Sequence, residues 1–145
     1  MNLEEMILRG ELSREPASAG DIRRLIDAAT RRLKGAANTS IHPETRLEQA
    51  YHAILNCALI ALRAGNLKAV NGPGKHRFAI ESLADTLGTA PDAIAYLQQL
   101  RHLRHRDIYE GSIHVSEREA EDAITEASKL LEHLRTWLDV RADKP

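Results

Sequence analysis

Apolar side chains recur about every three to four positions through most of this chain, the spacing that places them on one face of an α-helix. The pattern predicts five helices, near residues 20–34, 43–64, 76–87, 89–110 and 116–140. Four of them end at a residue type that commonly stops a helix: Gly35, Gly65, Gly88 and Gly111. The second, fourth and fifth helices are long and one-sided, which is typical of an antiparallel bundle. We therefore predict an all-α, five-helix bundle.

Composition supports this fold class. Hydrophobic residues make up 43% of the chain but aromatic residues only 3%, so the core must consist mainly of Leu, Ile and Ala. Such a core suits closely packed helices and does not suit a sheet, which favours β-branched and aromatic residues. At 145 residues, we expect one bundle domain at 20–140. We expect 1–19 to be an extension that is docked or partly mobile, and 141–145 to be a frayed tail.

The charge balance narrows the classes of partner. Lys and Arg number 20 against 21 Asp and Glu, so the whole chain exerts no general attraction on nucleic acid, although a local patch remains open. The single Cys57 excludes an intrachain disulfide and is interpreted as a small core residue. No apolar run has the length of a bilayer span, and the acidic N-terminal stretch does not resemble a signal peptide. We expect a cytoplasmic protein without a membrane partner.

Arg104 breaks the pattern of the fourth helix. It falls near the centre of the apolar face formed by Ala93, Leu97, Leu100 and Ile108. A guanidinium cannot lose its proton, so burying it without a partner is costly. The position predicts that a carboxylate or carbonyl receives Arg104, or that this face ends in a cleft or a subunit interface.

The sequence around Arg104 is strongly basic. Its neighbours in the last turns of the helix are Arg101, His102, His105 and Arg106. Cations at these positions complement the helix dipole, and Asp107 or an acidic residue at the start of the last helix is a candidate partner for Arg104. We also treat Arg101, His102 and Arg106 as candidate binding residues.

The histidines and a Gly-rich segment are further candidates for a functional site. His102 and His105 are three residues apart, but the other histidines follow no metal-ligand spacing, so we predict neither a metal nor a cofactor. The Gly-rich segment at 71–76 predicts a tight turn between helices, because it lacks the full phosphate-loop pattern. His76 begins the next helix and is a candidate binding residue that reaches toward a neighbouring helix. Tyr51 belongs to the apolar stripe of the second helix and is expected in the core.

The order of helices and two short motifs resemble the HEPN superfamily of small helical bundles. One motif is Tyr51-His52-Ala53 in the second helix, and the other is the basic end of the fourth helix. Members often have an Arg, a polar residue, and a His or Tyr about one turn later, and Arg104, His105 and Tyr109 occupy those places. The resemblance covers most of the chain.

The resemblance implies two alternative functions. Many members are metal-independent ribonucleases of toxin–antitoxin or defence systems that act as homodimers, with Arg104 on the phosphate and His105 and Tyr109 as further catalytic candidates. Others are non-catalytic modules that work with a partner such as an antitoxin or a nucleotidyltransferase. Tyr109 stands where active members usually have a histidine, and a tyrosine of pKa about 10 is a poor base at neutral pH. The expected ligand is RNA or a nucleotide, and the expected dimer forms through the face around the fourth helix.

Overall fold

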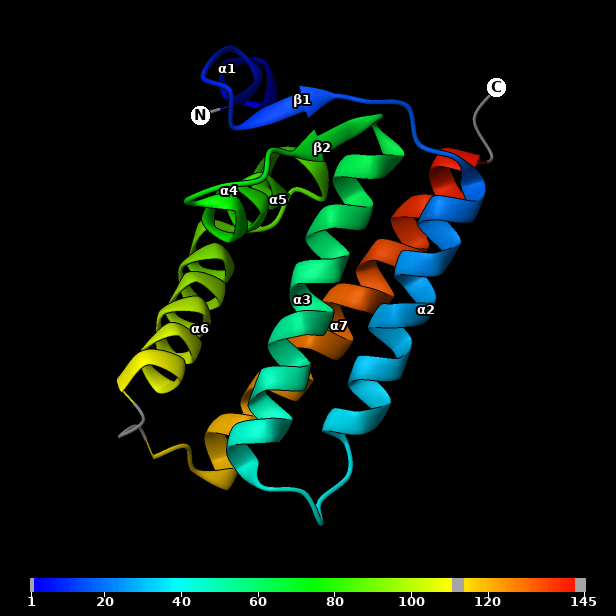
Figure 1. Cartoon of the computed structure of the whole chain (residues 1–145). Helices are drawn as coiled ribbons and strands as arrows, with labels where there is room; N and C mark the ends of the chain where they lie inside the picture. The colour runs from blue at the N-terminus through cyan, green and yellow to red at the C-terminus, as the bar shows by residue number, and fades with distance from the viewer. Residues whose placement is uncertain (1, 111–113, 143–145) are drawn as a thin grey trace.

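A computed structural model describes residues 2–110 and 114–142, apart from the side chains of 106–110. The chain is mostly helical (Figure 1). In chain order the elements are α1 (Leu3–Leu8), β1 (Leu12–Arg14), α2 (Ala19–Ala36), α3 (Pro43–Ala64), β2 (Leu67–Ala69), α4 (Lys75–Glu81), α5 (Leu83–Thr86), α6 (Pro91–Glu110) and α7 (Glu117–Ala142). Within the described ranges, no helix combines the length and apolar character needed to cross a bilayer.

Four of the five predicted helices, the first, second, fourth and fifth, correspond to α2, α3, α6 and α7, with ends that differ by only a few residues. The predicted third helix is interrupted at Ser82, which ends α4 and precedes α5. The Ser82 side chain is fully buried, and its hydroxyl donates a 2.6 Å hydrogen bond to the carbonyl of Ala79. A serine that bonds to the preceding turn in this way competes with the regular helical pattern, which explains the break.

The expectation of an all-α fold is wrong in one detail, because β1 and β2 form a small antiparallel sheet. Leu12 pairs with Ala69, and Arg14 pairs with Leu67. The sheet lies across one end of the bundle, beside α1 (Figure 1). Leu12 and Met6 are buried there, so this N-terminal segment contributes to the core. Three-residue strands are too short to show an alternating pattern in the sequence.

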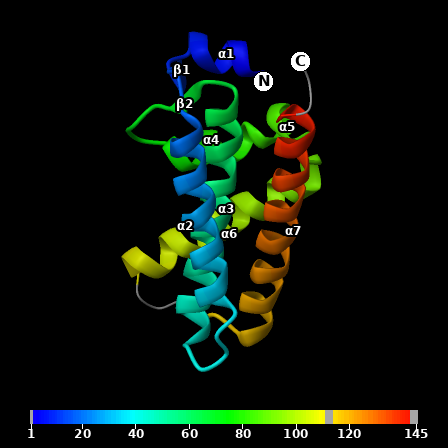
Figure 2. The same ribbon diagram turned by 90° about the vertical axis from the view of Figure 1, so that its right-hand side faces the viewer.

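The core is organised around α3, which contacts α2, α4, α5, α6, α7 and β2. Two views at right angles show α3 running alongside α2, with α7 packed behind them (Figures 1 and 2). The buried side chains of α3 are mainly aliphatic and small, as the composition predicted, and include Leu47, Ile54, Ala58 and Leu62. Cys57 is fully buried, and burial raises the pKa of its thiol to about 12. The prediction that Cys57 is a core residue is confirmed.

Arg46 places a charge inside this core. Arg46, near the start of α3, is only 4% exposed. Its Nε donates to the carbonyl of Ala36 at 2.8 Å, and its Nη2 donates to Glu121 Oε1 at 2.6 Å. Arg46 therefore joins the end of α2 to α7, and the exposed side of Glu121 keeps the ion pair in contact with water.

We predict that the backbone contact of Arg46 matters more for stability than its ion pair. Arg46→Ala should lower the free energy of unfolding by about 2–4 kcal/mol, because it leaves a buried carbonyl unpaired and creates a cavity. Glu121→Gln should cost less than about 1 kcal/mol, because the half-exposed carboxylate is screened and Gln retains an acceptor. Urea unfolding of both variants measures the difference. Equal losses would show that the ion pair, rather than the backbone contact, stabilises the fold.

Candidate functional site

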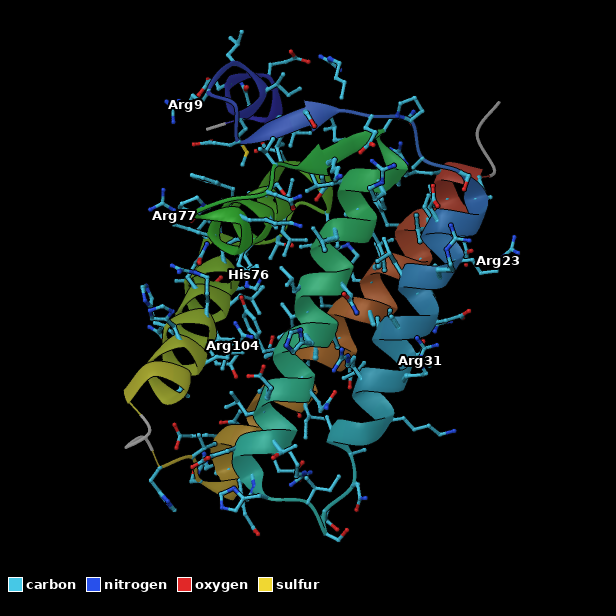
Figure 3. The ribbon with its side chains drawn as sticks, viewed as in Figure 1. Arg9, Arg23, Arg31, His76, Arg77 and Arg104 are labelled. Atoms are coloured by element: carbon cyan, nitrogen blue, oxygen red, sulfur yellow. The ribbon has the colours of Figure 1, made fainter. Side chains whose placement is uncertain are left out.

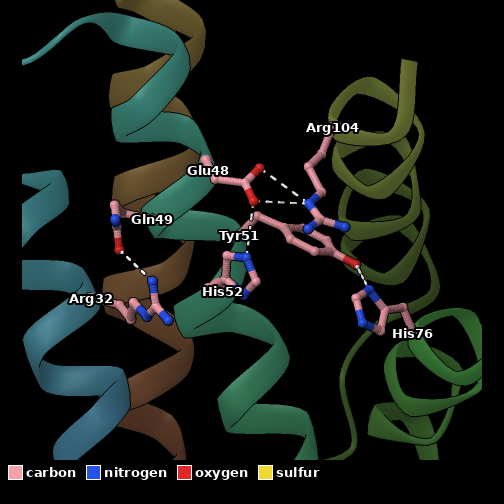
Figure 4. A network of polar contacts seen from close by, with 7 residues as sticks. All are labelled: Arg32, Glu48, Gln49, Tyr51, His52, His76 and Arg104. Atoms are coloured by element: carbon pink, nitrogen blue, oxygen red, sulfur yellow. Dashed lines mark hydrogen bonds and ion pairs between the residues drawn. The ribbon is translucent and has the colours of Figure 1, made fainter. Parts of the chain in front are cut away.

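Arg104 projects from α6 toward α3, where Glu48 receives it (Figure 4). Its Nε lies 3.0 and 3.1 Å from the two carboxylate oxygens of Glu48, and its side chain is 23% exposed. The expectation that a carboxylate receives Arg104 is confirmed, but the carboxylate lies on α3: of the candidate partners at the start of the last helix, none of the described residues is paired with Arg104. The other predicted partner, Asp107, lies outside the described side chains. Arg104 is thus paired across two helices and still reached by solvent.

Glu48 is held in its ionised form by two neighbours. His52 Nε2 lies 2.9 Å from Glu48 Oε1, one helical turn along α3. The hydrogen bond from His52, together with the contact from Arg104, lowers the pKa of the Glu48 carboxyl despite its partial burial. Glu48 therefore provides a fixed negative charge for Arg104. Sequence reasoning missed this residue, although its spacing of three and four residues from Tyr51 and His52 places all three on one face of α3.

The aromatic ring of Tyr51 packs against the guanidinium group of Arg104. The guanidinium carbon of Arg104 lies 5.5 Å from the centre of the Tyr51 ring, within the range of a cation–π contact. Tyr51 is fully buried, which confirms the core prediction, and its hydroxyl lies 3.0 Å from Nδ1 of His76. Burial raises the pKa of Tyr51 to about 12, so the phenol stays protonated near neutral pH. Tyr51 therefore connects Arg104 to His76.

His76 lies in the first turn of α4 and reaches α3, as the sequence suggested (Figure 4). Partial burial lowers the pKa of its imidazole, and so do the surrounding cations, first among them Arg104. The ring is thus neutral near pH 7. The preceding Gly74 is required locally, because its φ of +85° is left-handed and an added Cβ would lie 2.9 Å from the Phe78 ring.

Arg104 and His76 line one hollow of about 370 Å³ between the 72–77 segment and α6, which we call the basic hollow. Its described lining residues are Gly72, Gly74, Lys75, His76, Arg77, Arg101, Arg104 and His105. None of these is acidic, and Glu48 lies behind Arg104 rather than in the lining. Figure 3 shows His76, Arg77 and Arg104 on the same side of the molecule. The local excess of positive charge contrasts with the nearly neutral chain.

The structure brings together only some of the predicted site residues. Arg101 lines the basic hollow and is oriented by Gln98, whose Oε1 accepts a 2.7 Å hydrogen bond from Arg101 Nε. His105 is exposed and also lines the hollow. His102 is exposed, contacts Arg101 at 3.3 Å, and is absent from the described lining. Arg106 and Tyr109 fall outside the described side chains.

Lys75 and Arg77 belong to the basic hollow but were not predicted. The available signal was the run Lys75-His76-Arg77 after the glycine turn, which places three nitrogen-bearing side chains at one helix start. Another hollow, of about 400 Å³, is lined mainly by apolar residues near Met6 and Ile94, with Glu81 as its described charge. The basic hollow is the stronger candidate because titratable and cationic groups converge on it.

Comparisons with protein-family models, with curated proteins and with solved structures found no match for this chain. Among the described residues, no group of three or more His, Cys, Asp or Glu side chains is arranged to hold a metal ion.

The geometry of Arg104 leaves it able to bind a second group. Its Nε is occupied by Glu48, whereas Nη1 and Nη2 extend away from that carboxylate (Figure 4). No hydrogen bond joins these two nitrogens to the described part of the chain. Because an arginine presents five N–H donors in a planar fork, it can bind an anion without leaving Glu48.

Proposed function

We propose that this chain is an RNA- or nucleotide-directed module in which the basic hollow binds a phosphate group. The observation that supports this most strongly is the pairing of Arg104, whose Nε is held by Glu48 while its terminal nitrogens form no hydrogen bond with the described residues. A guanidinium binds phosphate through short, charge-assisted and often paired hydrogen bonds. Glu48 would then act as a clamp that orients the arginine toward its ligand.

The charges around the hollow favour the same ligand class. Lys75, Arg77 and Arg101 accompany Arg104, and Glu48 offsets only part of their charge. An RNA strand presents a negative phosphate at every nucleotide, and contacts to those phosphates dominate non-specific affinity. The chain as a whole carries almost no net charge, so the positive charge of the hollow is a local property of this surface.

We further propose an HEPN-like bundle in which Arg104, His105 and Tyr109 form a metal-independent ribonuclease site. The arrangement of α3 beside the end of α6 supports this proposal, because it places the Tyr51-His52 pair next to the basic helix end. His105 is the candidate acid–base group of this motif. His76, which lies outside the motif, adds a second imidazole at the same hollow.

The non-catalytic alternative has one specific observation in its favour. Arg104 already has an ionised partner in Glu48, which is what a purely structural ion pair requires. In this alternative the module would use the same surface to bind a partner such as an antitoxin or a nucleotidyltransferase. Replacing Arg104 with an apolar residue separates the two functions: Glu48 is partly exposed and keeps its contact with His52, so the fold can tolerate the lost ion pair, whereas a phosphate site loses its main donor.

We predict that Arg104→Met weakens binding of a single-stranded oligoribonucleotide by about ten- to a hundredfold, as expected when charge-assisted hydrogen bonds are lost. Arg104→Lys should recover only part of the affinity, because it restores the charge but not the fork. The control is Arg31→Met, which removes an exposed arginine from α2 on the other side of the molecule (Figure 3). Fluorescence anisotropy at constant salt measures all four proteins.

The same proteins test catalysis when the oligoribonucleotide is incubated in the presence of a chelator. Cleavage by the wild type that is lost in Arg104→Met supports the ribonuclease. Binding without cleavage supports the non-catalytic alternative. If Arg104→Met and Arg31→Met bind as well as the wild type, Arg104 does not hold a phosphate and the proposed site is wrong.

We also propose that the chain forms a homodimer through the face around α6. Hollows between α6 and α7 leave Tyr96 and Leu103 only partly buried, so this face has apolar surface to contribute. Sedimentation velocity at micromolar concentration should give the mass of two chains, and Leu103→Glu should shift it to one. A wild-type monomer under these conditions would contradict the dimer.

A further inference from the structure

We propose that His76 takes up a proton when an anion enters the basic hollow, and that the charged ring then binds the anion through Nε2. This inference rests on the proposed function, because it concerns the same hollow. It assigns to His76 a role that Arg104 cannot have, since the charge of an arginine does not respond to its ligand.

The geometry of His76 leaves one ring nitrogen for a ligand. Nδ1 is engaged by the Tyr51 hydroxyl at 3.0 Å, and the ring forms part of the hollow beside Arg104. No hydrogen bond joins Nε2 to the described residues. A histidine whose one nitrogen is fixed by a buried partner presents the other in a defined direction, which is the usual arrangement of functional imidazoles.

The titratable and charged groups near His76 in the described part of the chain come from three helices. They are Glu48 and His52 on α3, with the neutral Tyr51; Lys75 and Arg77 on α4; and Arg101, Arg104 and His105 on α6. Among the described side chains, Lys75 and the arginines outnumber the carboxylate of Glu48, which is already bound by Arg104 and His52. An added proton on His76 is therefore unfavourable while the hollow lacks an anion.

A bound phosphate reverses this balance. Its negative charge offsets Arg104 and Lys75, so the protonated ring becomes favourable; the added proton gives the ring an N–H donor at both nitrogens instead of one. Nδ1–H donates to the Tyr51 oxygen, which remains a phenol because burial raises its pKa to about 12. Nε2–H donates to the anion. The pKa of His76 is thus higher in the complex than in the free protein.

The sign of the pH dependence follows from this difference. The complex binds more protons than the free protein between the two pKa values of His76, so affinity must rise as the pH falls through that interval. One proton limits the slope to about tenfold per pH unit. Below the lower pKa, both states are protonated and the contribution of His76 levels off.

The test uses a single-stranded oligoribonucleotide whose phosphodiesters stay ionised throughout, with affinity measured between about pH 5.5 and 8, where histidines titrate. Wild-type affinity should rise several-fold toward the acidic end. His76→Gln should lose most of that rise, whereas His133→Gln, an exposed site on α7, should keep it. NMR titration of the His76 ring in the wild-type protein should show a higher pKa when the oligoribonucleotide is bound, and needs no variant.

The outcomes separate this inference from the proposed function. An unchanged His76 titration on binding, or a pH dependence fully retained in His76→Gln, overturns the proton uptake while leaving phosphate binding intact. If the oligoribonucleotide binds at no pH in this range, the proposed function itself fails. A raised pKa in the complex together with a flattened profile in His76→Gln supports both.

Discussion

The contact between Nε of Arg104 and the carboxylate of Glu48 is the interaction on which the site depends. It joins α6 to α3 and fixes the guanidinium over the Tyr51 ring. Because it uses only one of the three guanidinium nitrogens, it orients Arg104 without consuming its binding capacity. The hydrogen bond from His52 lowers the pKa of Glu48 and favours its ionised form. The hydroxyl of Tyr51, in turn, is hydrogen-bonded to His76. Of these connected residues, Arg104 and His76 line the basic hollow.

Arg46 and Arg104 are both paired with a glutamate on another helix, but their surroundings differ. Arg46 is almost completely buried, and both ends of its guanidinium are bound, to the Ala36 carbonyl and to Glu121. It is therefore a structural connection between helices. Arg104 is more exposed, lines a hollow, and among the described residues its hydrogen bonds run only from Nε to Glu48. The sequence singled out Arg104 because it interrupts an apolar face, whereas Arg46 gave no comparable signal.

Periodicity predicted the four long helices and showed that Arg104 interrupts an apolar helix face, because it reveals which face of a helix is buried. It did not reveal which helices face each other, so the partner of Arg104 was sought on the last helix rather than at Glu48. The β1–β2 pair was missed because three-residue strands have no readable period. His76 was noticed at the glycine turn, but its contact with Tyr51 joins residues 25 positions apart and depends on the tertiary fold.

The central claim is that Arg104 binds a carboxylate and a phosphate at the same time. The most direct measurement is a crystal structure with a bound 2′-O-methyl oligoribonucleotide, which resists cleavage through the 2′-oxygen. The account predicts a phosphate oxygen within about 3 Å of Nη1 or Nη2 of Arg104 while Nε remains on Glu48. An oligoribonucleotide bound elsewhere, with Arg104 contacting Glu48 alone, would contradict it.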